Sequence, residues 1–160
     1  MDKTNVMRIL DAHKISYEPL SFISEEALSG SQMADALGVP HDKTYKTLVT
    51  AGTSRKNYVF MIPVDEELDL RKCAKAVGEK KIEMIHSKDL LPLTGYIHGG
   101  CSPIGMKKPF KTTIDKSAEE FDEIVFSAGK VGFMVKVSVE GLKKLVDLSF
   151  AALTVDNDKR

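Results

Sequence analysis

The sequence predicts a single α/β domain of the mixed α+β kind, in which helices pack around a mixed β-sheet. The chain has 160 residues, the usual size of one domain, and 42% of them are hydrophobic, which is enough to build a core. Its β-rich runs come in hairpin-like pairs. Helical patterns are interleaved with those pairs, and this order favours a mixed sheet over a doubly wound parallel one.

The N-terminal segment predicts a helix followed by a strand. Val6, Ile9 and Leu10 recur at helical spacing behind Thr4, whose hydroxyl is suited to cap the first turn. Residues 17–22 are rich in strand-forming residues, so a strand is expected there.

A short helix and a hairpin are expected next. Ser31 is a candidate cap for a helix over residues 32–37, and Gly38 is placed to end it. Residues 45–51 and 58–64 are two β-rich runs that flank the polar stretch GTSRKN. Two such runs around a short polar turn are typical of a β-hairpin.

The second half of the chain alternates short helices and strands. The expected helices cover residues 70–77, 88–91, 118–121 and 139–145. The expected strands cover residues 82–85, 112–115, 123–127 and 132–137. Ser87 is the expected cap of the helix at 88–91, and residues 128–130 are the expected turn between the last two strands. The Gly- and Pro-rich segment between residues 94 and 110 is expected to be irregular.

Residues 1–155 are expected to form the domain, and residues 156–160 a polar tail. The N-terminus is too polar for a signal peptide, and no stretch approaches the ~20 apolar residues of a membrane span. We therefore expect a cytoplasmic protein without membrane contact, in which Cys73 and Cys101 are reduced thiols. The formal net charge is zero, which is not typical of a strong nucleic-acid binder but allows a local basic face.

Common catalytic signatures are missing from the sequence. It contains no phosphate-binding P-loop, no HExxH zinc motif, no GxSxG nucleophile elbow and no dinucleotide fingerprint. The two cysteines and four histidines lack the spacing of a zinc site. We therefore expect neither a metal nor a cofactor.

Lys46 is the first candidate for chemistry, because it lies inside the β-rich run of residues 45–49. A buried ammonium group is costly unless it is paired, so a lysine in a strand can indicate a pocket. Such a lysine can hold a phosphate, a carbonyl or a ribose. The pattern also allows the simpler alternative, in which the strand alternates and Lys46 points to water.

The second candidate is the glycine-rich loop at residues 99–105. Glycines let the backbone approach a ligand closely, and their N–H groups can bind an anion or a carbonyl; a tight structural turn is the alternative. Within the loop, Cys101 lacks a credible general base, since His98 is only three residues away on the same segment, and a nucleophilic role is disfavoured. Seven lysines near or before the loop can form a basic surface or simply a solvated face: Lys72, Lys75, Lys80, Lys81, Lys107, Lys108 and Lys111.

Three ordered motifs resemble the YbaK/EbsC family, relatives of the prolyl-tRNA synthetase editing domain. Residues 45–49, YKTLV, resemble the family's lysine-bearing strand. Residues 94–108 are similar to its Gly-Gly-x-Ser-Pro-x-Gly loop and the Lys-Lys pair that follows. Residues 125–130 resemble its Ser-(Ala/Gly)-Gly-Lys turn. The similarity runs from about residue 5 to about residue 150, so it covers nearly the whole chain.

The resemblance implies a hydrolase that acts in trans on mischarged tRNA and clears Cys-tRNA(Pro). It implies that Lys46 is catalytic and holds the 3′ acceptor end, with no metal, no cofactor and no protein nucleophile, because the substrate's own thiol attacks the ester. Prolyl-tRNA synthetase is a further implied partner. The implied substrate-binding residues are Phe22, Tyr45, Thr47, Gly99, Gly100, Cys101, Ser102, Pro103, Gly105, Ser127 and Gly129.

Three departures from the family pattern concern the choice of amino acid. Phe22 stands where a tyrosine is common, Val131 where an arginine often follows the turn, and Lys136 where an acidic residue is common. Two alternatives therefore stay open: a deacylase for alanine or another small amino acid, and a non-catalytic module that binds tRNA or a synthetase. The Lys46-Thr47 and Ser102-Pro103 pairs favour cysteine, because relatives that clear alanine tend to carry Lys-Asn and Thr-Pro at these places.

Overall fold

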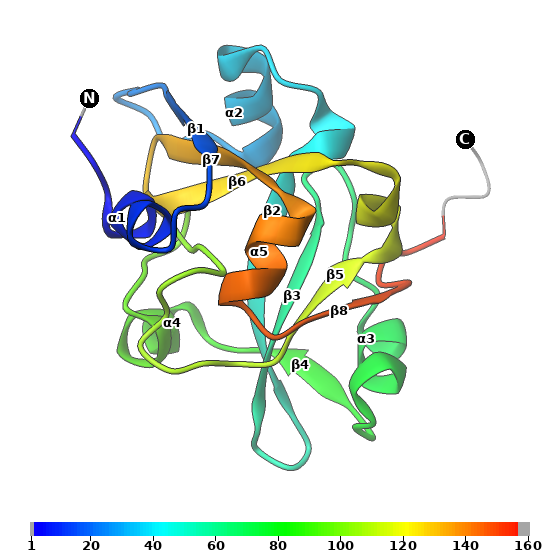
Figure 1. The fold of residues 1–160 in the computed structure, drawn as a ribbon. Helices are drawn as coiled ribbons and strands as arrows, with labels where there is room; N and C mark the ends of the chain where they lie inside the picture. The colour runs from blue at the N-terminus through cyan, green and yellow to red at the C-terminus, as the bar shows by residue number, and fades with distance from the viewer. Residues whose placement is uncertain (1, 157–160) are drawn as a thin grey trace.

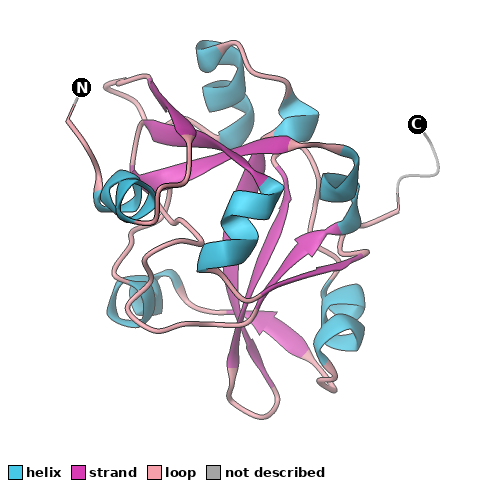
Figure 2. Ribbon diagram, viewed as in Figure 1, coloured by secondary structure: helices cyan, strands magenta, loops and turns pink. Residues whose placement is uncertain are grey.

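The structure, a computed structural model, describes residues 2–156 and has eight strands in two sheets (Figures 1 and 2). The larger sheet has the order β4-β2-β3-β5-β8, with strands β4 (Ile82–Met84), β2 (Tyr45–Gly52), β3 (Asn57–Pro63), β5 (Thr112–Asp115) and β8 (Leu148–Ala151). The smaller sheet is antiparallel and has the order β1-β7-β6, with strands β1 (Tyr17–Ser21), β7 (Phe133–Ser138) and β6 (Glu123–Lys130). The larger sheet is mixed, because β3, β5 and β8 run parallel while β2 is antiparallel to both its neighbours. The mixed α/β class is therefore confirmed, with the strands divided between two sheets.

Within residues 2–156, five α-helices and two 3-10 turns surround the sheets. The helices are α1 (Asn5–Ala12), α2 (Gly30–Leu37), α3 (Leu70–Val77), α4 (Ser87–Thr94) and α5 (Val139–Leu145), and the turns are η1 (His41–Lys43) and η2 (Lys116–Glu120). Figure 1 shows α1 and α4 at one side of the molecule, α3 at the other and α2 above the smaller sheet. None of the helices within residues 2–156 is long and apolar enough to cross a membrane.

The main core lies between the two sheets and under α1 and α5. Phe126 and Val135 of the smaller sheet, Val59 of the larger one, Leu10 of α1 and Leu142 of α5 belong to this cluster and are fully buried. Burial of each such side chain contributes about 1.5–3 kcal/mol to folding. A second cluster lies under α3 and a third lies under α2, where Met33 packs with Val125 and Met134. The third cluster anchors α2 to the smaller sheet.

Most of the predicted elements are confirmed, including the β2–β3 hairpin and the closure of α2 and α3 by Gly38 and Gly78. The predicted cap of α2 is wrong: Ser29 caps the helix in a reciprocal capping box with Gln32, while Ser31 bonds to Asp65.

The predicted cap and end of the helix at 88–91 are also wrong. Ser87 is the first residue of α4, and His86 stands at the cap position without a side-chain hydrogen bond. The helix continues through Pro92 to Thr94, whose hydroxyl donates to Leu90 O at 2.7 Å.

The turn in the C-terminal hairpin lies three residues later than predicted. Strand β6 continues through a bulge to Lys130, which pairs with Phe133. Gly132, at φ 87°, supplies the left-handed conformation of the actual turn. Strand β8 was not predicted at all, and it follows α5 directly. Asp156, the first residue of the predicted tail, forms an ion pair with Lys72, and residues 157–160 lie outside the described residues.

Candidate active site

A cavity of about 590 Å³ lies along β2, where the two sheets separate. All five residues from Tyr45 to Val49 line it. Its other walls come from α2 with the residues before it, the segment around α4, the glycine loop and the smaller sheet. They are Leu28, Ser29, Gly30, Met33, Val64, Met84, Ile85, Ser87, Leu90, His98, Gly99, Cys101, Ser127 and Met134. Within the described part of the chain, no Asp or Glu lines this cavity.

Lys46 is half-buried in the wall of this cavity. Its register partner on β3 is Ile62, and no carboxylate among residues 2–156 forms an ion pair with it. Met33, Leu48 and Val64 line the same cavity and are apolar, and a lower local dielectric strengthens the attraction between an ammonium group and an anionic or carbonyl oxygen. A role for the Lys46 side chain inside the cavity stays a prediction.

The cavity gathers six of the predicted site residues. They are Tyr45, Lys46, Thr47, Gly99, Cys101 and Ser127. Ser127 Oγ accepts a hydrogen bond from Gly129 N at 3.1 Å, so its own proton remains free to donate. Tyr45 turns its hydroxyl away to Ser117 Oγ at 2.7 Å, and burial raises the pKa of Tyr45 to about 12. Tyr45 is therefore a neutral structural contact at neutral pH.

The other predicted site residues do not line the cavity. They are Phe22, Gly100, Ser102, Pro103, Gly105 and Gly129. Gly105 and Gly129 make room for Tyr96, since a Cβ on either would lie 2.9 Å from that ring or its hydroxyl. Tyr96 in turn donates to Ile104 O, so these glycines hold the shape of the loop. Direct substrate contact by this group stays a prediction.

The departures from the family pattern lie outside the cavity wall. Phe22 is 43% exposed, and its N–H extends the β1–β7 pairing to Gly132 O at 2.9 Å. Lys136 forms an ion pair across the same strands with Glu18 at 3.3 Å. Val131 lies against the glycine loop, 3.1 Å from a Cβ placed on Gly100.

Sequence reasoning missed the contribution of α2 to the cavity. Ser29, Gly30 and Met33 form one wall, and Val64 and Met134 extend it. Gly30 lies so close to Val64 that an added Cβ would come within 2.6 Å of its Cγ1. No local motif marks these residues, because they reach the cavity only through the packing of α2 on the smaller sheet.

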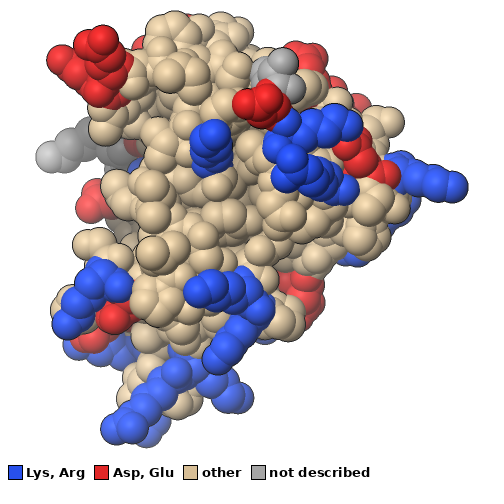
Figure 3. Space-filling model, turned by 90° about the vertical axis from the view of Figure 1, so that its left-hand side faces the viewer, with Lys and Arg blue, Asp and Glu red and all other residues tan. Residues whose placement is uncertain are grey.

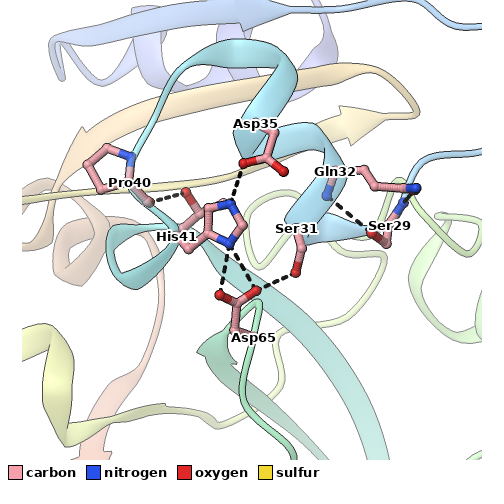
Figure 4. Close-up of polar contacts among 8 residues, drawn as sticks. Ser29, Ser31, Gln32, Asp35, Pro40, His41 and Asp65 are labelled. Atoms are coloured by element: carbon pink, nitrogen blue, oxygen red, sulfur yellow. Dashed lines mark hydrogen bonds and ion pairs between the residues drawn. The ribbon is translucent and has the colours of Figure 1, made fainter.

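His41 ties α2 to the end of β3 (Figure 4). Its Nε2 lies 2.7 Å from Asp35 Oδ1 on α2, and its Nδ1 lies 2.8 Å from Asp65 Oδ2. Hydrogen bonds to Asp35 and then to Asp65 raise the pKa of His41, while Ser31 and His41 lower the pKa of Asp65. Because both ring nitrogens face carboxylates, the imidazolium form is favoured, and it holds the α2 wall in place.

We expect the hydrogen bonds of His41 with Asp35 and Asp65 to make the stability of the fold depend on pH. Because the pKa of His41 is raised in the fold, protonation of His41 stabilises the folded state. This contribution is complete below pH 6.5, the ordinary pKa of histidine, and is lost as the pH rises through the folded-state pKa. Because the pKa of Asp65 is lowered in the fold, ionised Asp65 stabilises the folded state above pH 3.8, its ordinary pKa. This contribution is lost as the pH falls through the folded-state pKa. His41→Ala should therefore lower the melting temperature most between pH 3.8 and pH 6.5, and progressively less above pH 7. His86→Gln, at an exposed histidine without a side-chain cap bond, is the matched control. A His41→Ala effect that is flat from pH 5 to 9 would contradict this.

Cys101 is buried in the cavity wall, only 9% exposed, and burial raises its pKa to about 12. His98 also lines the cavity, but no hydrogen bond joins it to Cys101 in the part of the chain that the structure describes. A thiol without a base and with a raised pKa is a poor nucleophile at neutral pH. The side chain acts as a small apolar contact.

We expect Cys101→Ala to keep at least about a third of the wild-type rate of ester hydrolysis, measured as amino acid released from charged tRNA. The reason is that only a packing contact is removed. A loss of about a thousandfold or more, the scale of removing a covalent nucleophile, would assign the attack to this thiol.

The seven lysines that could have formed a basic surface do not lie on one face of the molecule. Lys72 is bound to Asp156 Oδ1 and Thr154 O, both at 2.7 Å, and Lys81 pairs with Glu83 at 3.0 Å. Helix α3, which carries Lys72 and Lys75, lies on the opposite side of Figure 1 from α4. Figure 3 shows Lys and Arg side chains in separate groups, with uncharged surface between them, on the face that carries α1 and α4 in Figure 1.

Residues 24–145 match the family model described as the aminoacyl-tRNA editing domain. This chain belongs to that family, whose members hydrolyse mischarged aminoacyl-tRNA, and it is an enzyme of the aminoacyl-tRNA deacylase class. Within the family it is 46% identical over 153 residues to the Enterococcus faecalis protein named "Putative Cys-tRNA(Pro)/Cys-tRNA(Cys) deacylase EbsC". That match covers 95% of this chain and 93% of the relative. The family and enzyme class expected from the three motifs are confirmed.

A proline–tRNA ligase of Trichlorobacter lovleyi is 26% identical over 100 residues, which is 62% of this chain but only 17% of the ligase. Two solved structures share the fold. One is described as a "putative trans-editing enzyme for prolyl tRNA synthetase", with a TM-score of 0.80, 20% identity and coverage of 98% of this chain and all of the other. The other, the hypothetical protein APE2540, has a TM-score of 0.84, 18% identity and coverage of 95% and 100%.

Proposed function

We propose that this enzyme clears cysteine from Cys-tRNA(Pro) in trans, using the cavity along β2 as its active site. The observation that carries the proposal is Lys46, which lines a largely apolar cavity and forms no ion pair with a carboxylate among residues 2–156. The 46% identity to a relative named for Cys-tRNA(Pro) and Cys-tRNA(Cys) supports the choice of cysteine.

The reaction needs little help from protein side chains, because an aminoacyl ester is already activated. The substrate thiol attacks its own ester carbonyl, a C–S bond forms and the C–O bond to the ribose breaks. The thiol proton passes to the departing 3′ oxygen, and water then opens the strained cyclic thioester to free cysteine. Attack within one molecule has a high effective concentration, which offsets part of the ring strain.

Lys46 fixes the ribose and stabilises negative charge on the departing oxygen. Main-chain N–H groups at Gly99 and the free proton of Ser127 can bind neighbouring oxygens. Among residues 2–156, no cluster of three His, Cys, Asp or Glu side chains is placed to hold a metal ion. The steps above involve the cavity residues, the substrate and water.

We also propose that residues 1–155 form one aminoacyl-tRNA deacylase domain that acts in the cytoplasm, where tRNA is charged. The cavity is large enough for the terminal aminoacyl-adenosine, a ligand of the size that such cavities hold. We place the rest of the tRNA outside this cavity. Prolyl-tRNA synthetase is the proposed partner that supplies recognition of the remainder.

The test is amino acid release from Cys-tRNA(Pro), Pro-tRNA(Pro) and Cys-tRNA(Cys), each compared with its spontaneous hydrolysis. Catalysed release of cysteine with survival of Pro-tRNA(Pro) supports the proposal. Binding of all three tRNAs without release would instead identify a non-catalytic module. Comparable loss from both cysteinyl-tRNAs would show that the enzyme reads the amino acid and that tRNA choice comes from a partner.

A further inference from the structure

The edge of β2 that faces the cavity has a gap in its strand pairing. Val64 N donates to Thr44 O at one end of the β2–β3 ladder, and Gly52 N donates to Lys56 O at the other, both at 2.9 Å. Hydrogen-bonded pairs alternate along an antiparallel ladder, so the main-chain groups of Lys46, Leu48 and Thr50 face β3. Those of the intervening residues, Thr47 among them, face the opposite edge.

Other strands pair with that opposite edge near its two ends. At the β4 end, Thr53 N donates to Lys81 O at 3.1 Å, and Ile85 N donates to Val49 O at 3.4 Å. After Ile85 the chain continues into α4. At the other end, Thr44 forms an isolated bridge with Val125 of β6. Thr47 lies between these contacts, and within residues 2–156 no strand is paired with it on this edge.

Two further observations place this gap in the cavity. Five consecutive residues of β2 line it, although their side chains alternate between the two faces of the sheet, and this requires the strand edge itself to face the cavity. The Thr47 hydroxyl is also buried and has no hydrogen-bond partner among the described residues. Buried polar groups in proteins are nearly always paired, so this stretch is suited to a polar ligand.

An aminoacyl ester carries the groups that would fill the gap. Its α-ammonium donates and its ester carbonyl accepts, with the spacing of one residue of a polypeptide chain. A residue in the hydrogen-bonded register of an antiparallel ladder makes both bonds with the single residue opposite. Because no carboxylate among residues 2–156 lines the cavity, a main-chain carbonyl is a suitable acceptor for the ammonium.

We propose that the open edge of β2 recognises the main chain of the substrate amino acid, which pairs with Thr47 as a one-residue strand. The Thr47 C=O accepts from the α-ammonium, and the Thr47 N–H donates to the ester carbonyl, where negative charge develops. The inference rests on the proposed function and adds to it. Lys46 holds the ribose, while Thr47 positions the ester carbonyl for attack.

The test removes one partner of each bond. The Thr47 N–H is removed by replacing Thr47 with its α-hydroxy analogue in the full chain, and the same change at Thr53 is the control. Thr53 is the same residue type on the same edge, and its N–H bonds to Lys81 O outside the cavity. On the substrate side, 3-mercaptopropionyl-tRNA(Pro) keeps the thiol and the ester but lacks the α-amino group. Each enzymatic rate is divided by the spontaneous rate of the same ester.

We expect the Thr47 change to lower kcat/KM for Cys-tRNA(Pro) by about a hundredfold, the scale of losing one oxyanion donor, and the Thr53 change by less than about threefold. Loss of the α-amino group should lower the normalised rate by about ten- to a hundredfold. If wild-type enzyme clears Cys-tRNA(Pro) but either Thr47 or the α-amino group proves dispensable, this inference is wrong and the proposed function stands. If wild-type enzyme does not clear Cys-tRNA(Pro), the proposed function itself fails.

Discussion

Lys46→Met should reduce the deacylation of Cys-tRNA(Pro) by about two to three orders of magnitude while the protein stays folded. The change keeps most of the side-chain length and removes the only charge that β2 places in the cavity wall. Loss of a preorganised donor at a site of developing negative charge has an effect of this size. Stability should change by less than about 1 kcal/mol, because Lys46 has no ion pair to lose within residues 2–156.

The control for Lys46 is Lys56→Met, which removes an equal charge from an exposed position just before β3, outside the cavity. It should keep near wild-type activity, and a matching loss there would attribute the effect to general attraction of tRNA. Thermal unfolding of all three proteins shows whether the fold is kept. A folded Lys46→Met variant with wild-type turnover would remove Lys46 from the mechanism.

The second large effect concerns the sulfur of the substrate. If the substrate thiol is the nucleophile, S-methylcysteinyl-tRNA(Pro) should be cleared at least about a hundredfold more slowly than Cys-tRNA(Pro), because methylation removes the attacking group. Ser-tRNA(Pro) should also be cleared slowly, since a hydroxyl is far less ionised at neutral pH than a thiol with a pKa of about 8.5. The measurement is the loss of labelled amino acid at equal enzyme concentration, corrected for spontaneous hydrolysis.

S-methylcysteine is larger than cysteine, so poor binding is the competing explanation for its survival. A non-hydrolysable Cys-tRNA analogue and its S-methyl counterpart, compared as competitive inhibitors, separate the two explanations. Similar inhibition constants assign the difference to chemistry. Rapid clearance of the S-methyl ester would instead point to a protein group or a positioned water as the attacking species.

The local elements were predictable because they depend on short-range patterns. The hairpin of β2 and β3 follows from two β-rich runs, and α3 follows from its apolar spacing and Gly78. Strand β8 was missed because its four residues, LSFA, have no distinct pattern and are held by parallel pairing with β5. The division into two sheets likewise depends on pairing between distant strands, which no local signal fixes.

The site was only partly predictable for the same reason. Lys46 stood out because a lysine within an apolar strand is costly, and the structure places it in a cavity wall. The role of α2 could not be predicted, because Met33 packs with Met134, a residue far away in the sequence. The unpaired stretch of β2 at Thr47 could not be predicted either, because it depends on where the pairing with β4 ends and on the single bridge between Thr44 and Val125.

The most direct measurement of the account compares the release of cysteine and alanine from the same tRNA. Wild-type enzyme is mixed in turn with Cys-tRNA(Pro) and Ala-tRNA(Pro) at equal concentration, and the initial rates are corrected for spontaneous hydrolysis. Alanine fits any space that admits cysteine but carries no nucleophile. A ratio of at least about a hundred in favour of cysteine is the result that the substrate-thiol mechanism predicts. Comparable rates would contradict it and would identify the enzyme as a deacylase for small amino acids that uses water.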